Sequence, residues 1–209
     1  MSIDLAAIDS VVTWKGGLPV ITTERLLLRI GDHTDIESEL QFYRENENHL
    51  GPWFPDSGRM HLNRATMEQF VPEFRKRALH DQAYRFQLSL KTEPKRYSGV
   101  VSLSRLQRGP EQSATLGYGI AKALEGHGFM SEAVRAVVRF CFVDLDLHRL
   151  EACYAPANER SATLLKACGF EIEGTLRESL LINGKWCDHI LTSLLNPNWR
   201  GTGRVERAR

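Results

Sequence analysis

The sequence is poor in cysteine, has no long apolar run, and has no excess of charge of either sign. Its four cysteines form no C-x-x-C pair and have no metal spacing, so we expect free thiols in a reducing compartment. No stretch approaches the roughly 18 apolar residues that a membrane-spanning helix needs. The net charge of +1 offers no bulk attraction to nucleic acid or to an anionic membrane. We therefore expect a soluble, cytoplasmic protein that binds neither directly. The cysteines are Cys141, Cys153, Cys168 and Cys187.

The length of the chain suits one large domain better than two. At 209 residues with 42% hydrophobic content, it can bury a full core. No internal repeat or low-complexity segment interrupts it. Residues 1–19 have no sustained period and are predicted to form an N-terminal extension. Residues 20–199 are predicted to form the domain, and residues 200–209 an arginine-rich basic tail.

One stretch, residues 114–170, has the clearest pattern in the chain. In its first eight residues, apolar side chains alternate with small or polar ones, which is typical of a strand with one buried face. A loop with two glycines, Gly126 and Gly128, follows, and apolar residues then recur at helical spacing from Phe129. The glycines therefore lie where a strand ends and a helix begins. The apolar positions of the strand are Ala114, Leu116, Tyr118 and Ile120.

This junction has the properties of an anion site. The first backbone N–H groups of a helix have no partner within the helix, and glycine lets the backbone come close to a phosphate. A plain tight turn is the competing interpretation. A dinucleotide fold is disfavoured because Ser131 stands where its third glycine belongs. The array of amides comprises Gly126, His127, Gly128, Phe129, Met130 and Ser131.

The other predicted elements indicate an α/β fold with a mixed sheet. The second predicted helix, residues 62–80, contains Pro72, which we expect to kink or divide it. Asn158 is placed to cap a helix that Gly169 ends. The sheet should be antiparallel at first and gain a βαβ crossover later. Its predicted strands are residues 23–30, 84–90, 99–103, 114–121 and 148–154.

The order of these parts resembles the acetyl-CoA half of the GNAT N-acetyltransferases. It resembles more closely the RimJ/RimL branch, which acetylates the N-terminal amines of ribosomal proteins. The resemblance covers residues 22–199 and includes residues 180–199, which are similar to the closing strands of RimJ-like members. It implies a GNAT fold: a central, mixed and strongly twisted sheet flanked by helices, with the cofactor cleft between the fourth and fifth predicted strands. It also implies acetyl-CoA as the acetyl donor and no metal.

The resemblance assigns the cofactor to named positions. In the family, the asparagine that matches Asn158 holds the pantetheine arm, and the serine that matches Ser161 donates a hydrogen bond to the leaving thiolate. A backbone N–H of a bulged central strand, here near Gly119 or Ile120, binds the carbonyl oxygen of the thioester. As a structural alternative, Asn158 and Ser161 occupy cap positions of a helix, where such residues occur without any function. Gly119, Ile120 and Ala121, with the amides of residues 126–131, complete the predicted cofactor site.

The loop at residues 45–55 resembles the acceptor loop of the branch, whose motif is E-N-x-x-x-L-x-P-W. Its two prolines and its glycine predict that it has no regular structure. The competing interpretation is that Trp53 and Phe54 only cover the core. The residues that the resemblance places on the acceptor side are Glu45, Asn46, Trp53, Tyr118 and Glu178.

Two departures from the family pattern concern the phosphate loop. The pattern Q/R-x-x-G-x-G/A has Ala123 at its first position here, and Glu125 adds a negative charge beside the expected pyrophosphate. A basic residue would have to offset this charge. The candidates are Arg135, Arg160 and Lys166.

A third departure concerns the catalytic base. The glutamate of RimL-type proteins aligns with Leu180, so Glu178 is the base that the resemblance favours, with Glu45 and Asp188 as weaker alternatives. The predicted catalytic residues are therefore Ser161, Glu178 and Tyr118.

The function expected from the resemblance is transfer of acetyl from acetyl-CoA to an amine, by direct attack in a ternary complex. The expected acceptor is the N-terminal α-amine of a protein, with ribosomal proteins as the candidates that the resemblance implies. Two alternatives stay open: acetylation of a small, antibiotic-type amine, and a non-catalytic acyl-CoA-binding or ribosome-associated factor. The protein is expected to be a monomer or a homodimer.

Overall fold

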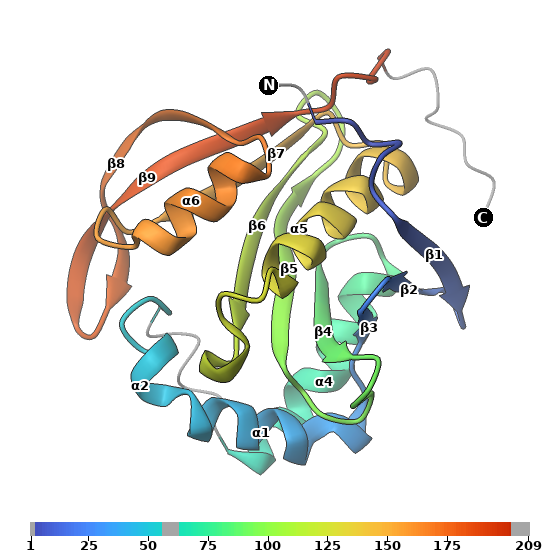
Figure 1. Cartoon of the computed structure of the whole chain (residues 1–209), viewed down its shortest axis with the longest axis vertical. Helices are drawn as coiled ribbons and strands as arrows, with labels where there is room; N and C mark the ends of the chain where they lie inside the picture. The colour runs from blue at the N-terminus through green and yellow to red at the C-terminus, as the bar shows by residue number, and fades with distance from the viewer. Residues whose placement is uncertain (1–2, 56–62, 202–209) are drawn as a thin grey trace.

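The computed structural model describes residues 3–55 and 63–201. Within them, the strands form one sheet with helices on both faces (Figure 1). The strands are β1 (Ser10–Lys15), β2 (Leu18–Thr23), β3 (Leu26–Ile30), β4 (Tyr84–Leu90), β5 (Gly99–Gln107), β6 (Ser113–Ile120), β7 (Arg149–Tyr154), β8 (Glu171–Ile182) and β9 (Lys185–Leu195). The helices are α1 (Ile36–Glu45), α2 (Glu47–Leu50), α4 (Arg64–Leu79), α5 (Phe129–Arg139) and α6 (Glu159–Ala167), with short turns η1 (His33–Asp35), η2 (Lys122–Leu124) and the π-helical η3 (Phe140–Asp144).

The sheet order is β1-β2-β3-β4-β5-β6-β7-β9-β8. Strands β6 and β7 pair in parallel, and every other neighbouring pair is antiparallel. The connection from β6 through α5 to β7 is the βαβ crossover predicted from the sequence. The mixed α/β architecture is thus confirmed, including the change from antiparallel to parallel pairing.

The first two strands differ from the prediction. Residues 10–15 form β1, which pairs with β2 through a turn at Gly16 and Gly17, both with positive φ. Strand β2 in turn pairs with β3, so residues before 20 belong to the same sheet. The predicted strand 23–30 is divided, because Glu24 and Arg25 turn the chain from β2 into β3. Strand β1 is an edge strand with only one buried residue, which leaves little alternation for a sequence to reveal.

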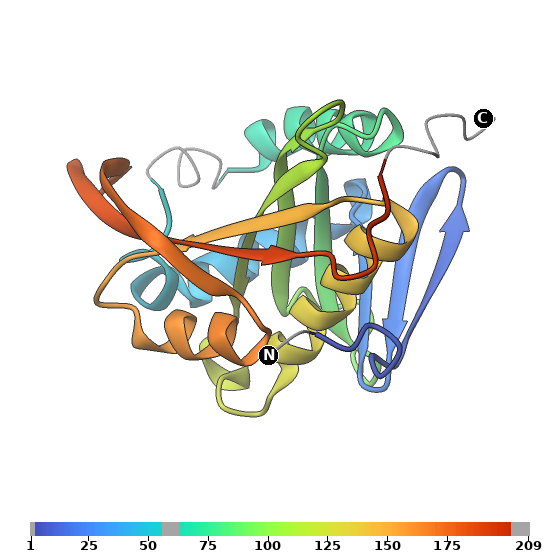
Figure 2. The ribbon, with the colours of Figure 1, turned by 90° about the horizontal axis from the view of Figure 1, so that it is seen from above.

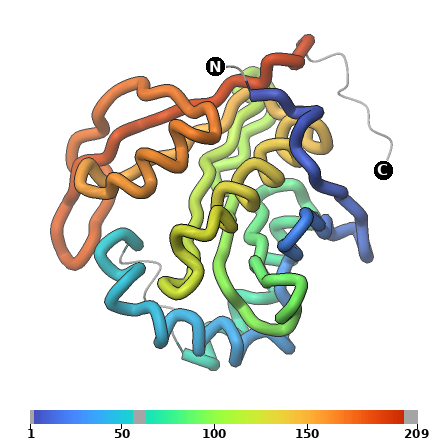
Figure 3. Tube along the Cα trace, viewed as in Figure 1, coloured from blue at the N-terminus to red at the C-terminus, as the bar shows by residue number. Residues whose placement is uncertain are grey.

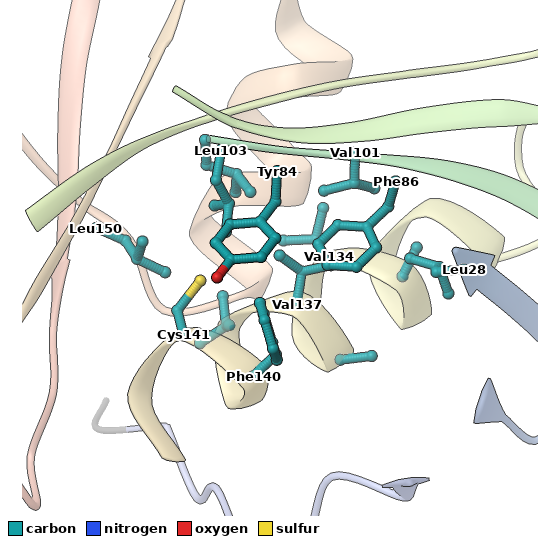
Figure 4. Packing of buried hydrophobic residues seen from close by; sticks show 14 of the residues in the cluster. Leu28, Tyr84, Phe86, Val101, Leu103, Val134, Val137, Phe140, Cys141 and Leu150 are labelled. Atoms are coloured by element: carbon teal, nitrogen blue, oxygen red, sulfur yellow. The ribbon is translucent and has the colours of Figure 1, made fainter. Parts of the chain in front are cut away.

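The helices cover opposite faces of the sheet. Helices α5 and α6 lie on one face, and α1 and α4 lie on the other (Figures 2 and 3). Figure 4 shows the core between α5 and the sheet, where Phe140 packs edge-on against Phe86 and Tyr84. A smaller apolar cluster joins α1 to α4. Each face of the sheet therefore has its own helical cover, and Ala78 of α4 also belongs to the main cluster that contains the residues of α5.

Most helix boundaries follow the sequence signals. Asn158 caps α6 through its side chain, and Gly169 follows the helix with φ 89°. Helix α4 continues undivided through Pro72. The loop predicted at residues 45–55 contains one short helix, α2, before its glycine. Leu62, the predicted start of α4, and residues 202–209 of the predicted tail lie outside the described residues.

Strands β6 and β7 separate along their length. Their parallel pairing runs from Ser113 opposite Arg149 to Leu116 opposite Ala152 and then ends, although both strands continue. This opening lies between the fourth and fifth strands that the sequence predicted, where the cofactor cleft was expected. No helix among residues 3–55 and 63–201 has the length and apolar character to cross a membrane.

Candidate active site

The opening between β6 and β7 leads into a cleft of about 1580 Å³. The lining residues come from both faces of the sheet, so the cleft passes through the sheet. On one face it is lined by the start of α5 and by α6; we call this the cofactor side. On the other face it is lined by the loop after α1, by α4 and by the β8–β9 hairpin; we call this the acceptor side. A volume of this size exceeds the range of about 300–1,000 Å³ for one drug-sized ligand and suits two substrates.

The loop before α5 presents its backbone to the cleft. Gly126 and Gly128 both have φ 78°, the left-handed region that favours glycine, and Gly128 is the N-cap of α5. The first hydrogen bond across the start of the helix runs from Glu132 N to Gly128 O. The N–H groups of Phe129, Met130 and Ser131 therefore have no acceptor within the helix. All three residues line the cleft, which gives the anion site that the sequence predicted a defined geometry.

Arg25, in the turn between β2 and β3, supports this loop from outside. Its Nη1 donates to the carbonyl oxygen of His127 at 3.0 Å, its Nε donates to Glu132 Oε2 at 2.6 Å, and its guanidinium lies 4.4 Å above the centre of the Phe129 ring. Burial opposes ionisation of Glu132, but hydrogen bonds from Thr23 and Arg25 outweigh it and lower its pKa. Arg25 is distant in sequence from the loop and was not predicted as a site residue.

Glu125 is paired with two cations and contacts one histidine. Arg160 Nη1 lies 2.8 Å from its Oε2, Lys122 Nζ donates to the same oxygen at 3.0 Å, and His49 Nε2 lies 3.4 Å from Oε1. Burial opposes ionisation of Glu125, but the hydrogen bond from Lys122 and the nearby charges outweigh it and lower its pKa. Arg160 is thus the predicted cation that offsets Glu125. Of the other two candidates, Arg135 donates instead to the carbonyl of Ala167.

Tyr118 and Ser161 meet on the cofactor side of the cleft. The phenol oxygen of Tyr118 lies 2.7 Å from Ser161 Oγ, across 43 residues of sequence. Ser161 also belongs to the cap of α6, because its N–H donates to Asn158 Oδ1 at 3.1 Å. Burial raises the pKa of Tyr118 far above its usual range, so the phenol stays protonated. The cap uses only the backbone of Ser161, which leaves its hydroxyl for chemistry.

The upper part of β6 directs backbone N–H groups into the opening. Ala121 N donates to Ser98 O on the β5 side, and N–H groups alternate between the two edges of a strand. The N–H groups of Tyr118 and Ile120 therefore face β7, beyond the last β6–β7 pair. The register with β5 is regular here. The bulge expected in this strand lies instead in β5, near Arg105, which has φ 47°.

The loop after α1 forms one wall of the acceptor side. Trp53 and Phe54 line the cleft, and a Cβ at Gly119 would lie 2.7 Å from the Phe54 ring. Asn46 is buried and structural, since its Oδ1 accepts from Lys122 N at 2.8 Å and its Nδ2 donates to Phe42 O. Glu45 is exposed, accepts from Gln41, and does not line the cleft. Of the three residues predicted in this loop, only Trp53 faces the cleft.

Glu178 lies in a bulge of β8 and faces away from the cleft. Between Leu176 and Leu180 the chain takes four steps, while the paired segment of β9 from His189 to Cys187 takes two. The extra residues break the period of two, and Glu178 has φ 47° with its N–H donating to Asp188. Leu176 and Leu180 line the cleft, but Glu178 does not. A regular strand would have placed all three on one face, and the resemblance favoured Glu178 for its position on this strand.

Two groups of polar side chains on the acceptor side were not predicted. Arg85 is half-buried and pairs with Glu39 at 2.5 Å and with the hydroxyl of Tyr43 at 2.8 Å. Burial raises the pKa of Tyr43. The second group is Ser179 and His189, whose Oγ and Nδ1 lie 3.1 Å apart. Alternation in β4 and β9 signals which face these residues share, but only the register between distant strands brings them to the cleft.

Comparisons with known proteins agree with this geometry. The family model described as acetyltransferase (GNAT) domain matches residues 25–171. The [ribosomal protein uS5]-alanine N-acetyltransferase of Escherichia coli (strain K12) is 35% identical over 183 residues, which cover 86% of this chain and 92% of that protein. The spermidine N(1)-acetyltransferase of Vibrio cholerae is 28% identical over 145 residues, which cover 68% of this chain and 78% of that protein.

Two solved structures have closely similar folds. The ribosomal-protein-S5-alanine acetyltransferase of Vibrio fischeri superimposes with a TM-score of 0.81 at 32% identity, over 87% of this chain and 99% of that chain. RimJ of Mycobacterium smegmatis, solved in complex with CoA-disulfide, has a TM-score of 0.77 at 27% identity, over 90% of this chain and 88% of that chain.

Proposed function

The chain belongs to the GNAT family of acetyl-CoA-dependent N-acetyltransferases, and we propose that its acceptor is the N-terminal α-amine of a protein. The observation that carries this proposal is the cleft through the sheet, which gives the acceptor a separate entrance on the face opposite the phosphate loop. The similarity to two ribosomal-protein-alanine acetyltransferases supports it. Action in the cytoplasm follows from that acceptor and is part of the proposal.

The residues on the cofactor side fit acetyl-CoA. The N–H groups of residues 126–131 supply donors for a pyrophosphate, and Arg25 holds the loop by donating to the carbonyl oxygen of His127. Gly126 has nothing within 4 Å of the position of an added Cβ, so a phosphate has room beside it. Acetyl-CoA supplies a thioester whose carbonyl carbon accepts an amine. Ala123 provides no side-chain donor at the position where the family pattern has a basic or polar helper.

In this proposal, the chain's own groups act at the two ends of the thioester. The N–H groups of Tyr118 and Ile120 donate to the carbonyl oxygen as it gains negative charge. Tyr118 donates its hydroxyl proton to Ser161 Oγ, and the Ser161 O–H is then oriented toward the departing sulfur. Because the raised pKa of Tyr118 lies far above the thiol value of about 8.5, this pair stabilises the thiolate without transferring a proton fully.

The acceptor side suits an extended chain with a free amine. The wall residues Trp53 and Phe54 and the polar surface of β5 and β6 form a groove across the sheet. Only a neutral amine attacks, and an α-amine with a pKa of about 7.7–8.0 is neutral in roughly one molecule in ten at pH 7. A lysine side chain with a pKa of about 10.4 is neutral in a few molecules per ten thousand. A site without a strong base therefore favours α-amines over lysine by about two to three orders of magnitude.

The proposal is tested by comparing acceptors under identical conditions. Steady-state rates are measured for a peptide that begins with alanine, for the same peptide with a blocked N-terminus and a free lysine, for spermidine and for an aminoglycoside. We expect the free α-amine to react at least about 100-fold faster in kcat/KM than the lysine peptide. Mass spectrometry of the product locates the acetyl group on the terminal nitrogen. Faster acetylation of spermidine, the aminoglycoside or the blocked peptide would refute the proposed acceptor and leave the acetyltransferase activity intact.

A further inference from the structure

We propose that His189 is the general base that removes the proton from the acceptor amine. This inference rests on the proposed function only in that an amine must enter from the acceptor side. His189 lies on β9, is 3% exposed, and lines the cleft next to Leu180 and Ser179. It therefore occupies the wall on which a base is expected, beside the leucine that stands at the position of the family glutamate.

The hydrogen bonds of the imidazole indicate its tautomer. Nδ1 lies 3.2 Å from the carbonyl oxygen of Cys187 and 3.1 Å from Ser179 Oγ. A carbonyl oxygen only accepts, so the contact with Cys187 is a hydrogen bond when the neutral ring carries its proton on Nδ1 and its lone pair on Nε2, and this is the tautomer that the proposal uses. Among the described residues, no hydrogen bond engages Nε2. Nε2 is therefore the ring nitrogen that is able to accept a proton.

Strand register places His189 on the face from which the amine enters. Thr115 of β6 is paired with Glu151 of β7, and Cys153 of β7 is paired with Leu191 of β9. Side chains of paired residues share a face, and so do side chains two residues apart on one strand. Gly117, Cys153 and His189 therefore lie on one face of the sheet, and all three line the cleft.

Tyr118 lies on the opposite face, because it neighbours Gly117 on β6, and there it meets Ser161. The groups that stabilise the leaving sulfur and the group that takes the proton are thus on opposite faces of the opening. This is the arrangement that an attack through the opening requires: the amine approaches from one face while the sulfur departs toward the other.

The carboxylates in the described part of the cleft are already engaged or lie on the other side. Glu39 is paired with Arg85, and Glu125 is paired with Arg160 and Lys122. Glu159 belongs to the first turn of α6, on the cofactor side. A carboxylate held by a guanidinium or an ammonium group is a weak base. The Nε2 lone pair of His189, on the acceptor side, has no such partner among the described residues.

The proposed step balances as follows. The lone pair of the amine nitrogen forms a bond to the carbonyl carbon, and the carbon–sulfur bond breaks with its electron pair remaining on sulfur. The proton that the nitrogen sheds moves to Nε2 of His189, giving an imidazolium that later releases it to water. An imidazole base matches an α-ammonium of pKa about 7.7–8.0 far better than a lysine of pKa about 10.4. The base itself therefore contributes to the preference for N-termini.

The first test removes the base and keeps the structural hydrogen bond. In His189→Asn, the amide nitrogen takes the place of Nδ1 and still donates to the Cys187 carbonyl, but nothing replaces Nε2. We expect kcat with the alanine peptide to fall about 100-fold or more, with an unchanged affinity for acetyl-CoA by calorimetry. The matched control is Thr192→Val on the same strand. It loses a buried hydrogen bond from Thr192 Oγ1 to Ala152 O and does not line the cleft, so kcat should stay within about twofold.

The second test adds the missing base from solution. In His189→Ala, imidazole in the buffer should restore at least about a tenth of the lost rate, while the Thr192→Val control should not respond. Nitrogen-15 spectra of histidine-labelled wild-type protein, at a pH where the ring is neutral, should show the proton on Nδ1. These readouts distinguish a base from a residue that only supports the fold.

Three results would overturn the inference: kcat of His189→Asn within about threefold of wild type, no response of His189→Ala to imidazole, or a proton found on Nε2. If wild type acetylates spermidine or the aminoglycoside in preference to the peptide, the proposed acceptor fails, and the same variants are measured with the preferred amine. The assignment of the base and the assignment of the acceptor are thus judged by separate observations.

Discussion

The cofactor side and the acceptor side of the cleft are built in different ways. The cofactor side is nearly continuous in sequence, from β6 through α5 and β7 to α6, and it presents backbone N–H groups and helix starts. The acceptor side combines α1, α2, α4 and the β8–β9 hairpin, and it presents side chains. Backbone donors stay the same when the side chains change, whereas a wall of side chains changes with each substitution. A site built from backbone donors suits a cofactor that is the same in every reaction. A site built from side chains suits an acceptor that differs from one enzyme to another.

The largest effect should come from the backbone of the cofactor side. Gly128→Val places a branched side chain where φ is 78° and where the backbone must approach a phosphate. We expect calorimetry to show a loss of at least about 100-fold in acetyl-CoA affinity, because the array of N–H donors is displaced. Gly109→Val is the control: Gly109 has φ 69° in a turn away from the cleft, so it carries similar strain without touching the array. Equal affinities in the two variants, both folded, would contradict a phosphate site at Gly128.

A smaller effect should come from the pair of Tyr118 and Ser161 on the cofactor side. Ser161→Ala removes the hydroxyl that meets Tyr118 and keeps the backbone N–H that Asn158 caps. We expect kcat to fall about 10- to 100-fold, the value of one hydrogen bond to a charged group, with little change in melting temperature.

Asn158→Ala supplies the converse measurement, since it removes the cap and leaves the hydroxyl of Ser161 in place. It should cost about 1 kcal/mol of stability. A Ser161→Ala variant that melts earlier but turns over normally would show that the serine serves only the helix.

The smallest effect should come from the ion pairs that hold the acceptor face together. Glu173 on β8 accepts from Arg149 on β7 and from Ser193 on β9, and the hydrogen bond from Arg149 lowers the pKa of Glu173 to about 2. A depressed pKa stabilises the fold above the unfolded value of about 4.3, and this contribution is lost as the pH falls toward 2.

Because the pair is partly exposed, Glu173→Gln should cost only about 0.5–1 kcal/mol at pH 7. Denaturant melts should show this difference shrinking as the pH falls from 5 to 2. A difference that stays constant across this range would mean that the charge of Glu173 does not contribute.

The difference between the cofactor side and the acceptor side also explains which site residues the sequence could predict. Period-two alternation, glycines at a strand-to-helix junction and an asparagine before a helix are local signals, and they located β6, the phosphate loop and the cap of α6. They could not locate Arg25, because its contact with His127 joins residues 102 positions apart. Contacts of this kind depend on which strands become neighbours, and no local pattern contains that information.

On the acceptor side, the resemblance favoured Glu178, which the structure does not place among the residues that line the cleft. Alternation through β8 groups Glu178 with Leu176 and Leu180, and a bulge with positive φ at Glu178 breaks the grouping. In the loop after α1, Asn46 was predicted to contact the acceptor, but it is buried and accepts a hydrogen bond from the backbone N–H of Lys122. A bulge depends on the partner strand, and a buried polar hydrogen bond depends on the loop that it reaches. The residues of the acceptor side could therefore not be predicted from the sequence alone.

The separation of β6 from β7 leaves an edge in the middle of a sheet. Beyond Leu116 and Ala152, the N–H groups of Tyr118 and Ile120 face the opening in place of a neighbouring strand. Protected amides exchange their hydrogens with solvent slowly, and these two should exchange faster than the paired amides of β6 until a ligand covers them. An uncovered edge of this kind also offers a template on which an extended segment of another chain can pair. The cleft that admits substrates is therefore also a place, besides the outer edges of the sheet, where the empty protein is open to unwanted strand addition.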